Sequence, residues 1–538
     1  MKKNLVYLVV LKPTSHRTSE ESLGVAYLAG VLEENNFEVR IRDAWLDSSI
    51  STEDIYNEIM DNKDRISFVG TSSYMLSNDV TCDLIKRLTK EGVNVASGGY
   101  GPTFEGKKFL NSGSKIVMLG EGESNIVDVA SHFSMGLPLI DQIKGIQYMD
   151  SEGEIVTTAK APAIHNLDSI PYPKRPYLDI VKDKKSTVNV LTSRGCKGAC
   201  TFCSISAFLG KQDSPRWRAR SIDNIIPELV QLQNQGATTI KFIDDSFIEN
   251  ERDGEWCRQF AEAVKENGIT MDFRGSIRAD KVTADIMSNL RDAGFFSFSC
   301  GIENGSPTAL KRMAKLASIE DNERALQIFK DNGIYVQAGF ILFDNKTTMT
   351  ELKENYNFMN KYKWLVSKGI FSEMFAAVGT QFTKSAGLEN DNKFASNNIY
   401  QIEDESARKV YTYMKKWQAH HSKVYDMVID PISAPKAIPV PNMKKYYDLM
   451  VEMKTIDLDF MRDIIAAVEN NYNLEEVYAN YEAEYTDRFR SIMSTAAEYY
   501  NFDGLDYNAG TNGFLLNGGQ KDIVIAKDKK AKDEMNCV

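Results

Sequence analysis

Three cysteines lie close together in the chain, at Cys196, Cys200 and Cys203. Their C-x3-C-x2-C spacing puts three thiolates on one short loop, where they can converge on a metal centre. A [4Fe–4S] cluster takes four thiolate ligands, so three cysteines would leave one iron open to a further ligand. Catalytic metal sites keep such an open position, whereas structural sites are closed. The spacing therefore predicts an iron–sulfur centre that takes part in chemistry.

Zinc is an alternative for this loop, as is a chance group of buried cysteines. A structural zinc ion takes four protein ligands, often including histidine. The histidines nearest in the sequence are His165 and His132, and neither adjoins the cysteines. Zinc is the poorer match, and both alternatives stay open on the sequence alone.

Composition narrows the class of protein further. The 538 residues include 64 Lys and Arg against 75 Asp and Glu, a net charge of -11, and no basic block offsets it. Such a chain is a poor partner for nucleic acid or an anionic membrane. No run of about 18 apolar residues indicates a membrane span. Seven cysteines in a chain of this length do not make a disulfide framework, so we expect a cytoplasmic protein in a reducing compartment.

Residues 1–150 alternate short apolar runs with amphipathic stretches of helical spacing. This alternation predicts an α/β domain with a doubly wound, Rossmann-like parallel sheet. Such sheets bind ligands outside the carboxyl ends of their strands. The runs expected to be strands are Leu5–Leu11, Val39–Ile41, Ile66–Val69, Val93–Ala96 and Ile116–Met118.

A second alternating region, residues 186–385, follows a proline-rich linker at 151–185. Its six apolar runs and the helical patterns between them predict a partial (β/α)6 barrel, whose chemistry would lie at the carboxyl ends of its strands. The cysteines come just after the first run. The six runs are Val188–Leu191, Thr239–Ile243, Met271–Gly275, Phe295–Cys300, Val336–Phe343 and Phe371–Val378.

The remaining residues, 386–538, are rich in Tyr, Asn and charged residues in long helical patterns. We expect a mostly helical C-terminal domain that closes the mouth of the barrel. The tail, about the last 20 residues, is expected to be disordered.

From the cysteine loop onward, the sequence resembles the radical S-adenosylmethionine (SAM) enzymes. The cysteine spacing, with the aromatic Phe202 before the last cysteine, is similar to the cluster loop of that family. Later segments match the family's strand ends in the right order, with Val378 in place of the usual proline of a Pro-Gly-Thr turn. These segments are Phe242–Phe247, Arg274–Asp280, Gly301–Ser306, Gly339–Leu342 and Gly379-Thr380.

The resemblance implies a [4Fe–4S] cluster on the three cysteines, with SAM chelated at the open iron. Reduction by an external donor such as flavodoxin or ferredoxin would cleave SAM to a 5′-deoxyadenosyl radical, which removes a hydrogen atom from the substrate. By residue type, Asp244 or Asp245 can accept hydrogen bonds from the methionyl ammonium. Glu303 can accept hydrogen bonds from the ribose hydroxyls, and Arg278 can balance the methionyl carboxylate.

The first domain resembles the cobalamin-binding (B12-binding) domain that precedes many radical SAM enzymes. The matching segments are Leu23–Ala29, Ser72–Leu76, Gly98-Gly99 with Pro102-Thr103, Gly120–Glu123 and Asn166–Pro173. The resemblance implies that cobalamin contacts Ser72, Ser73, Tyr74, Met75, Gly98, Gly99, Gly120 and Glu121. A first domain that has lost cobalamin binding, as in some members of the family, is the alternative.

One motif of the cobalamin-dependent mutases is absent. None of the five histidines lies in the Asp-x-His-x-x-Gly sequence that ligates cobalt there. The resemblance then implies that the nucleotide tail of cobalamin occupies a pocket near Gly98-Gly99, and that Tyr74, Met75 or Leu76 faces cobalt from below. A weakly donating lower face favours the low-coordinate cobalt that a nucleophilic cob(I)alamin requires.

The two resemblances together imply a cobalamin-dependent radical SAM methyltransferase. It would transfer the methyl group of methylcobalamin to an unactivated carbon of a small molecule or peptide. A cobalamin-using member that rearranges or cyclises its substrate without methylation is one alternative. A cobalamin or iron–sulfur sensor without turnover is another, although a sensor has no need of SAM contacts beside the open iron.

Overall fold

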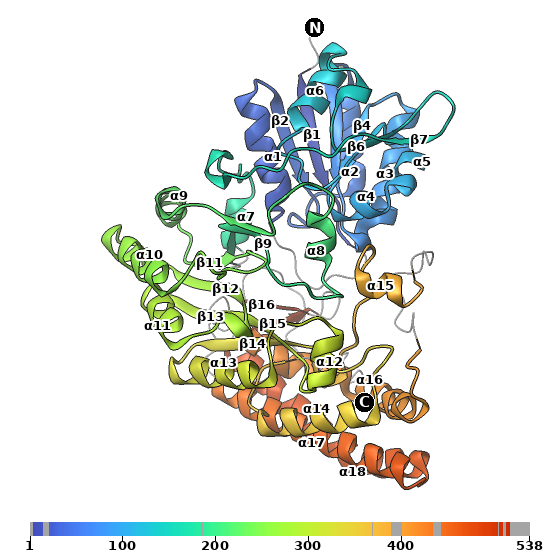
Figure 1. Ribbon diagram of the computed structural model, residues 1–538, viewed down its shortest axis with the longest axis vertical. Helices are drawn as coiled ribbons and strands as arrows, with labels where there is room; N and C mark the ends of the chain where they lie inside the picture. Colours follow the sequence, from blue (N-terminus) through green and yellow to red (C-terminus); the bar gives the residue numbers. More distant parts are fainter. Residues whose placement is uncertain are drawn as a thin grey trace.

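The computed structural model describes residues 4–13, 21–183, 187–367, 369–388, 401–433, 443–503, 505–508 and 513–516. Two α/β units follow each other along the chain, and a layer of long helices lies beyond the second (Figure 1). This arrangement confirms the predicted fold class. The tail that we expected to be disordered lies outside the described residues. None of the helices in the described ranges has the length and hydropathy of a membrane span.

The first unit holds a seven-stranded sheet in the order β2-β1-β3-β4-β5-β6-β7. Strands β1 to β5 are parallel, and β6 and β7 are antiparallel additions at one edge. The strands are β1 (Leu5–Val10), β2 (Glu38–Asp43), β3 (Ile66–Ser72), β4 (Val95–Gly98), β5 (Ile116–Met118), β6 (Ile146–Met149) and β7 (Ile155–Thr157). The helices are α1 (Leu23–Glu34), α2 (Thr52–Asp61), α3 (Asn78–Lys90), α4 (Tyr100–Phe104), α5 (Gly106–Asn111) and α6 (Ile126–Met135).

The sheet is doubly wound because it buries an apolar cluster on each face. Alternate residues of β1 show this: Leu8 packs with α1 and α6, whereas Tyr7 packs with α2, α3 and α5. The strand order reverses between β1 and β3, which makes this point the topological switch where such sheets bind ligands. Since β7 ends at Thr157, the sheet runs past the boundary that we expected at residue 150. We therefore propose a domain boundary after β7.

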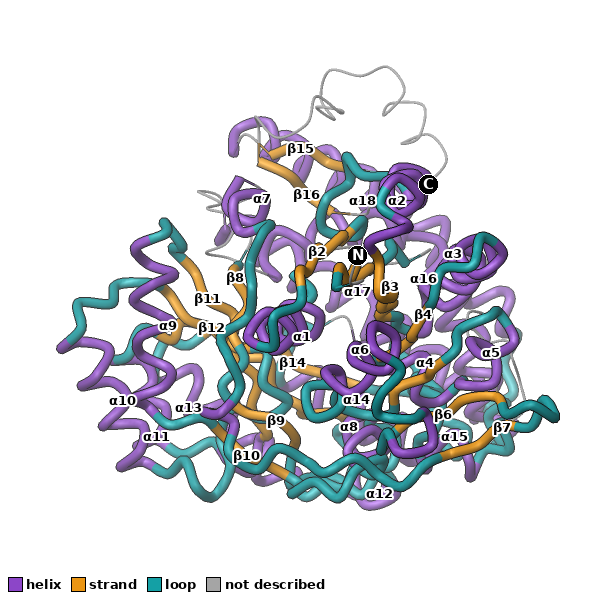
Figure 2. The backbone as a smooth tube through the Cα atoms, turned by 90° about the horizontal axis from the view of Figure 1, so that it is seen from above, coloured by secondary structure: helices purple, strands orange, loops and turns teal. Residues whose placement is uncertain are grey.

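The second unit holds a parallel sheet in the order β14-β13-β12-β11-β8. The strands are β8 (Val188–Val190), β11 (Thr239–Phe242), β12 (Asp272–Arg278), β13 (Phe295–Glu303) and β14 (Tyr335–Phe340). The helices are α7 (Leu178–Asp183), α9 (Ile222–Asn234), α10 (Gly254–Glu266), α11 (Ala284–Asp292), α12 (Pro307–Arg312), α13 (Ile319–Asp331) and α14 (Met349–Lys361). From above, α9, α10 and α11 line the outer side of this sheet, as expected of a partial barrel (Figure 2).

The sixth strand that we expected at 371–378 is not formed as a strand. In the described part of this edge, isolated parallel bridges join Gln337 of β14 to Val366, and Phe343, which follows β14, to Glu373. The following helix, α15 (Gln381–Ser385), packs beside the first unit (Figure 1). The barrel is therefore a five-stranded sheet with an irregular sixth edge.

Three long helices form the C-terminal layer: α16 (Glu405–Ser433), α17 (Met443–Glu469) and α18 (Leu474–Asp503). A short hairpin follows, β15 (Leu505–Asn508) with β16 (Gly513–Leu516). The Tyr425 hydroxyl donates to the Ser367 carbonyl at 2.7 Å, and the Tyr447 hydroxyl donates to the Trp364 carbonyl. The described parts of these helices thus lie along the irregular sixth edge, and the closure of the barrel mouth by this domain stays a prediction.

Candidate functional site

The three cysteines lie in the loop between β9 (Ser193–Gly195) and α8 (Ser204–Leu209), beyond the carboxyl end of β8. Strand β9 pairs with β10 (Trp217–Ala219) and so fixes the start of the loop. Gly195 has a left-handed φ of 93°, and a side chain there would clash with the carbonyl of Arg216. The Gly198 N–H donates to the sulfur of Cys196 at 3.3 Å. All three thiols are free and partly buried.

The candidate metal ligands of this loop are the three cysteine thiols. Among the residues that the structure describes, no three His, Cys, Asp or Glu side chains converge on one ion. Burial raises the pKa of Cys196 to about 11 and also raises the pKa of Cys200 and Cys203. The thiols are therefore protonated until a metal centre displaces their protons.

A carboxylate that the sequence analysis missed lies directly beneath this loop. Glu249, fully buried, accepts hydrogen bonds from the Lys197 N–H at 3.1 Å and from Nη1 of Arg278 at 3.1 Å. Its Oε1 is 3.6 Å from the sulfur of Cys196. The second carboxylate on Arg278 is Asp280, at 2.6 Å. The sequence could have indicated this residue, because Glu249 follows shortly after the expected strand Thr239–Ile243. Side chains at the carboxyl ends of barrel strands reach the catalytic site.

Glu303 and Lys315 form a buried pair on the other side of the cysteines. Glu303 ends β13 with a left-handed φ of 64°, and Lys315 Nζ lies 3.0 Å from its Oε1. Burial lowers the pKa of Lys315, but electrostatic interactions, of which that with Glu303 is the largest, outweigh it and the pKa is raised. A side chain at Gly301 would clash with this pair, so the glycine leaves room for it. The structure thus brings Arg278 and Glu303 to the cysteine loop, as the sequence analysis expected.

The two neighbouring aspartates have different surroundings. Both oxygens of Asp244 are occupied inside the protein: Oδ1 accepts from the Thr192 N–H at 2.7 Å, and Oδ2 accepts from the hydroxyls of Thr192 and Ser193 at 2.5 and 2.7 Å. The expectation that Asp244 contacts SAM is therefore corrected, because this carboxylate holds the strand that leads into the cysteines. Asp245 accepts from the Gly195 N–H at 2.9 Å, and burial raises its pKa to about 6.

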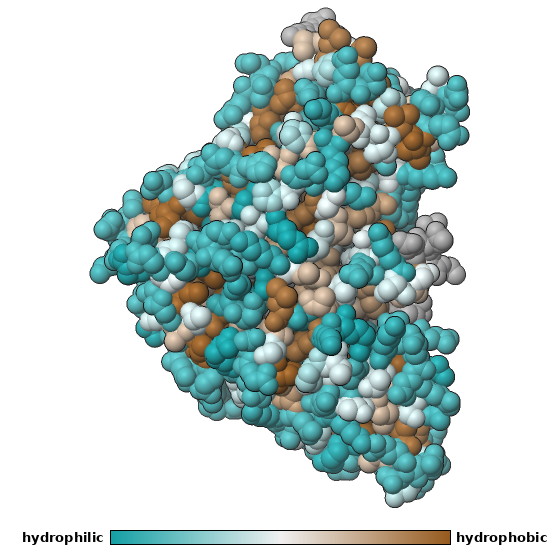
Figure 3. Space-filling view, viewed as in Figure 1, coloured by the Kyte–Doolittle hydropathy of each residue, from teal (hydrophilic) through white to brown (hydrophobic). Residues whose placement is uncertain are grey.

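A cavity of about 330 Å³ lies at the switch point of the first sheet. From the first unit it is lined by residues of β1, β3, β4, α1 and the loop after β5, including Leu8, Gly70, Ser72, Gly98, Gly99, Gly120 and Glu121. From the second unit it is lined by the cysteine-bearing segment, including Leu191, Arg194, Gly195, Ile205, Phe208 and Asp245. One cavity therefore adjoins both the carboxyl ends of the first sheet and the cysteine loop. Less polar residues also gather between the two units on the face shown in Figure 3.

Glycine shapes the wall of this cavity. Gly99 has a φ of 90°, and a Cβ there would lie 3.1 Å from the Ser72 hydroxyl and 3.2 Å from the Ser73 carbonyl. A Cβ at Gly70 would lie 2.8 Å from Leu8. A side chain at either position would crowd its protein neighbours, so both positions require glycine, whose backbone lines the cavity. The cavity has the volume and the largely apolar lining of a site for a small ligand or part of a cofactor.

The other residues expected at cobalamin divide into three groups. Ser73 is buried and donates to Asn78 at 2.6 Å, outside the cavity lining. Tyr74 is 43% exposed, with its ring 6.1 Å from that of Tyr100. Met75 begins the short helix η2 (Met75–Ser77), and its side chain is not among those described. Tyr74 therefore stays a candidate for the lower face of cobalt.

Glu121 lines the cavity but is engaged in ion pairs across the two units. Its carboxylate pairs with Arg218, and with Arg194 at 3.3 Å. Arg194 also pairs with Glu123 at 2.6 Å. These side chains are nearly buried, so they hold the first sheet against the cysteine-bearing hairpin. The side chain of Glu121 is thus a docking group between the units, which the sequence motif did not reveal.

Tyr100 makes a second contact between the units. Its hydroxyl donates to the Val378 carbonyl at 2.8 Å, and its ring lies 6.2 Å from that of Phe208 in α8. Gly379 follows with a φ of 83°, and a side chain there would clash with the ring of Phe104. Helix α4 is therefore packed directly on the turn that ends the barrel.

Comparison with known families decides the identity of both units. The radical SAM superfamily matches residues 190–359, and the B12 binding domain matches residues 15–130. The chain is a radical SAM enzyme with a B12-binding domain. Its cofactors are therefore a [4Fe–4S] cluster, SAM and cobalamin, and the residues described above fit all three.

Relatives of this radical SAM enzyme include several curated proteins. An uncharacterized methyltransferase of Pyrococcus horikoshii is 28% identical over 372 residues, covering 67% of this chain and 78% of the relative. An anaerobic magnesium-protoporphyrin IX monomethyl ester cyclase of Rubrivivax gelatinosus is 25% identical and covers 69% and 70% of the two chains. A cytidylyl-2-hydroxyethylphosphonate methyltransferase of Streptomyces wedmorensis is 23% identical and covers 60% and 68%.

Solved structures share the fold of the enzyme. The cobalamin-dependent SAM radical enzyme OxsB, with aqua-cobalamin and SAM bound, superposes with a TM-score of 0.74 at 17% identity, covering 93% of this chain and 79% of that one. The radical SAM methyltransferase TsrM from Kitasatospora setae, with tryptophan and a SAM analog bound, gives a TM-score of 0.58 at 16% identity, covering 68% and 72%. Both likenesses show that the two domains and their order are those of cobalamin-dependent radical SAM folds.

Gly99→Leu is expected to lower cobalamin occupancy at least tenfold while iron content stays unchanged. The left-handed backbone costs a side chain about 1–2 kcal/mol, and its Cβ would also crowd Ser73 and Ser72, of which Ser72 lines the cavity. Corrinoid absorbance and iron analysis of the anaerobically purified variant measure the two contents. Gly92→Leu is the matched control, because Gly92 has a φ of 77° with open space around it. Equal occupancy in the two variants would contradict the placement of the nucleotide tail.

Proposed function

We propose that this radical SAM enzyme transfers a methyl group, carried by cobalamin, to an unactivated carbon of its substrate. The observation that carries the proposal is the shared cavity, since one set of walls joins the B12-binding strand ends to the cysteine-bearing hairpin. When bound, SAM at the reduced cluster supplies hydrogen abstraction and cobalamin supplies the methyl group. This methyl transfer needs the two cofactors close together, because the substrate must meet both of them before water or side reactions intervene.

The chain's own residues have distinct roles in this proposal. Cys196, Cys200 and Cys203 hold the cluster, and Glu249 fixes the backbone of their loop. We assign the SAM contacts to Asp245, Arg278 and Glu303, whose charges surround the open side of the loop. This assignment rests on the position of the three residues at successive strand ends of the barrel.

For cobalamin, we assign contacts to two sets of residues. Ser72, Gly98, Gly99 and Gly120 line the cavity and would contact the nucleotide tail. Tyr74 would lie below the corrin. Glu121 also lines the cavity, but its carboxylate serves the contact between the units.

The test is product analysis with SAM that carries a deuterated methyl group. The protein is purified and reconstituted without oxygen, reduced, and supplied with candidate substrates. Methyl transfer is expected to yield 5′-deoxyadenosine, S-adenosylhomocysteine and a product heavier by the labelled methyl group. If SAM is cleaved to 5′-deoxyadenosine but no label reaches a product, methyl transfer is excluded for that substrate.

A reaction without methylation is the second candidate, because the Rubrivivax relative is a cyclase by name. Such an enzyme would yield 5′-deoxyadenosine without S-adenosylhomocysteine. A sensor would yield neither product. The same assay therefore separates all three functions.

The substrate class and the partners complete the proposal. We propose a small molecule or peptide as the substrate and flavodoxin or ferredoxin as the electron donor. We also propose a cytoplasmic location, because the free thiols of the cluster loop require a reducing compartment.

A further inference from the structure

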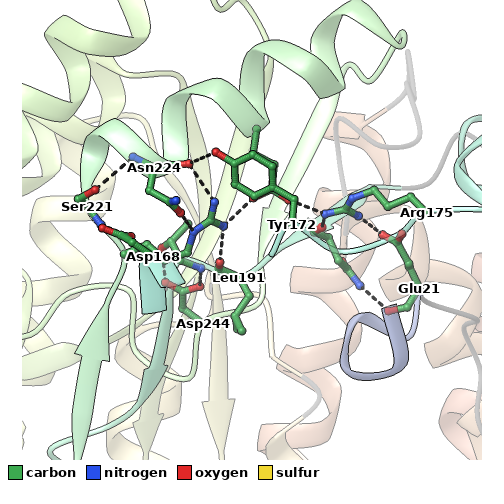
Figure 4. Close-up of polar contacts among 12 residues, drawn as sticks. Glu21, Asp168, Tyr172, Arg175, Leu191, Ser221, Asn224 and Asp244 are labelled. Carbon is green, nitrogen blue, oxygen red and sulfur yellow. Dashed lines mark hydrogen bonds and ion pairs between the residues drawn. The ribbon is translucent and has the colours of Figure 1, made fainter. Parts of the chain in front are cut away.

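Arg175, in the linker between the two units, contacts both of them with one side chain. Its Nη1 pairs with Glu21, which precedes α1 of the first unit. Its Nη2 donates to the Asn189 carbonyl in β8 at 2.8 Å and to Oε1 of Glu228 in α9 at 3.0 Å. All three charged side chains are less than one-tenth exposed. Figure 4 shows Arg175 turned toward Glu21, with Tyr172 of the same linker beside it.

The neighbouring linker residues divide their contacts between the two units. The Tyr172 hydroxyl donates to the Asn224 carbonyl of α9 at 2.8 Å (Figure 4). The N–H of Lys174 donates to the Ala26 carbonyl of α1 at 3.0 Å. The linker is therefore fixed to both units directly before Arg175, so the chain that leads into this residue is not a loose segment.

The partners of Arg175 lie next to both walls of the cofactor cavity. Glu21 is two residues before Leu23, and Asn189 is two residues before Leu191; both leucines line the cavity. If Glu21 and Asn189 moved relative to each other, the cavity walls formed by the first and the second unit would therefore move apart as well. A planar guanidinium holds several acceptors in fixed directions, so it sets an orientation as well as a distance.

We propose that Arg175 is a positioning residue that sets the register of the B12-binding domain against the radical SAM barrel, and hence the path of methyl transfer between their cofactors. This inference rests on the proposed function. A buried ion pair adds little to stability compared with apolar packing, but it can select one arrangement among several. Arg175 acts through the domains and touches neither cofactor site.

The test separates SAM cleavage from methyl transfer in Arg175→Met. We expect the ratio of methylated product to 5′-deoxyadenosine to fall on the order of ten- to a hundredfold, because a small misplacement of reacting groups costs that much. Iron content and 5′-deoxyadenosine formation should stay within about twofold of the wild type, since the cluster loop is intact.

Arg175→Lys should restore part of the ratio. Lys174→Met is the control, because the ion pair of Lys174 with Glu33 is exposed. An unchanged ratio in Arg175→Met, or an equal loss of cleavage and transfer, would overturn the proposal.

A second measurement uses the protein without its cofactors. Hydrogen–deuterium exchange of Arg175→Met and Glu21→Gln should be faster than in the wild type at residues 21–26 and 187–191, and unchanged in Lys174→Met. Protection equal to the wild type in both segments would overturn the role of Arg175. If the wild-type enzyme forms no methylated product, the proposed methyl transfer is contradicted. The hydrogen–deuterium exchange of the variants then tests the role of Arg175 by itself.

Discussion

Cys200→Ala is expected to abolish both the iron–sulfur chromophore and the cleavage of SAM. Two thiolates cannot hold a cube that already lacks its fourth protein ligand, and partners that only support metal ligands cost about 10- to 100-fold when lost. The loss for a direct ligand should be larger, so 5′-deoxyadenosine should fall below detection. Anaerobic iron and sulfide analysis, together with the electron paramagnetic resonance spectrum of the reduced protein, measures the cluster. Product chromatography measures the cleavage.

Cys82→Ala is the control for this variant. Cys82 is a buried cysteine of the first unit, on α3, away from the cluster loop. It should keep full iron content and SAM cleavage. A four-iron spectrum that survives in Cys200→Ala would remove the basis of the radical mechanism. Zinc bound in place of iron in the wild type would do the same.

Glu249→Gln should lower iron content and reduce SAM cleavage about 10- to 100-fold, as expected for a residue that orients metal ligands. The amide keeps the shape of the carboxylate but loses the charge that binds the Lys197 N–H and Arg278 together. Removing a buried negative charge beside Cys196 should also raise the reduction potential of the cluster. A redox titration followed by electron paramagnetic resonance measures this shift, which a purely structural defect would not produce.

Glu251→Gln is the matched control in the same loop. Glu251 pairs with Lys197 through the side chain, and both groups are partly exposed, so the pair contributes little. If Glu249→Gln and Glu251→Gln behave alike, the carboxylate beneath Cys196 has no special role.

The sequence predicted those parts of the site that are encoded in short segments. The cysteine loop is one example, because three ligands within one turn of chain have few other arrangements. Gly99 is another, since its left-handed backbone at a strand end excludes other residues. Arg278 and Glu303 could be expected beside the cysteine loop because the strand ends of a parallel barrel share one rim, and their contacts with SAM stay a prediction.

The parts that the sequence did not predict depend on partners distant in the chain. The sequence does not show whether an aspartate faces a ligand or the hydroxyls of other residues. Asp244 was therefore assigned to SAM, although it binds Thr192 and Ser193. Glu121 was taken for a cofactor contact because Arg194 and Arg218 reach it only after the two units meet. The prediction of a sixth strand was wrong for a similar reason. The apolar composition of 371–378 does not show that, within this range, the bridge to Phe343 is made by Glu373 alone.

The irregular sixth edge has a consequence for handling the protein. Strand β14 would end the sheet as an open row of N–H and C=O groups, which invites pairing with another chain and aggregation. Val366 and Glu373 form the bridges at this edge, and Tyr425 of α16 and Tyr447 of α17 donate to the neighbouring carbonyls of Ser367 and Trp364. A barrel truncated before Val366 would therefore expose this open edge, so the chain beyond β14 protects the sheet from pairing with another chain.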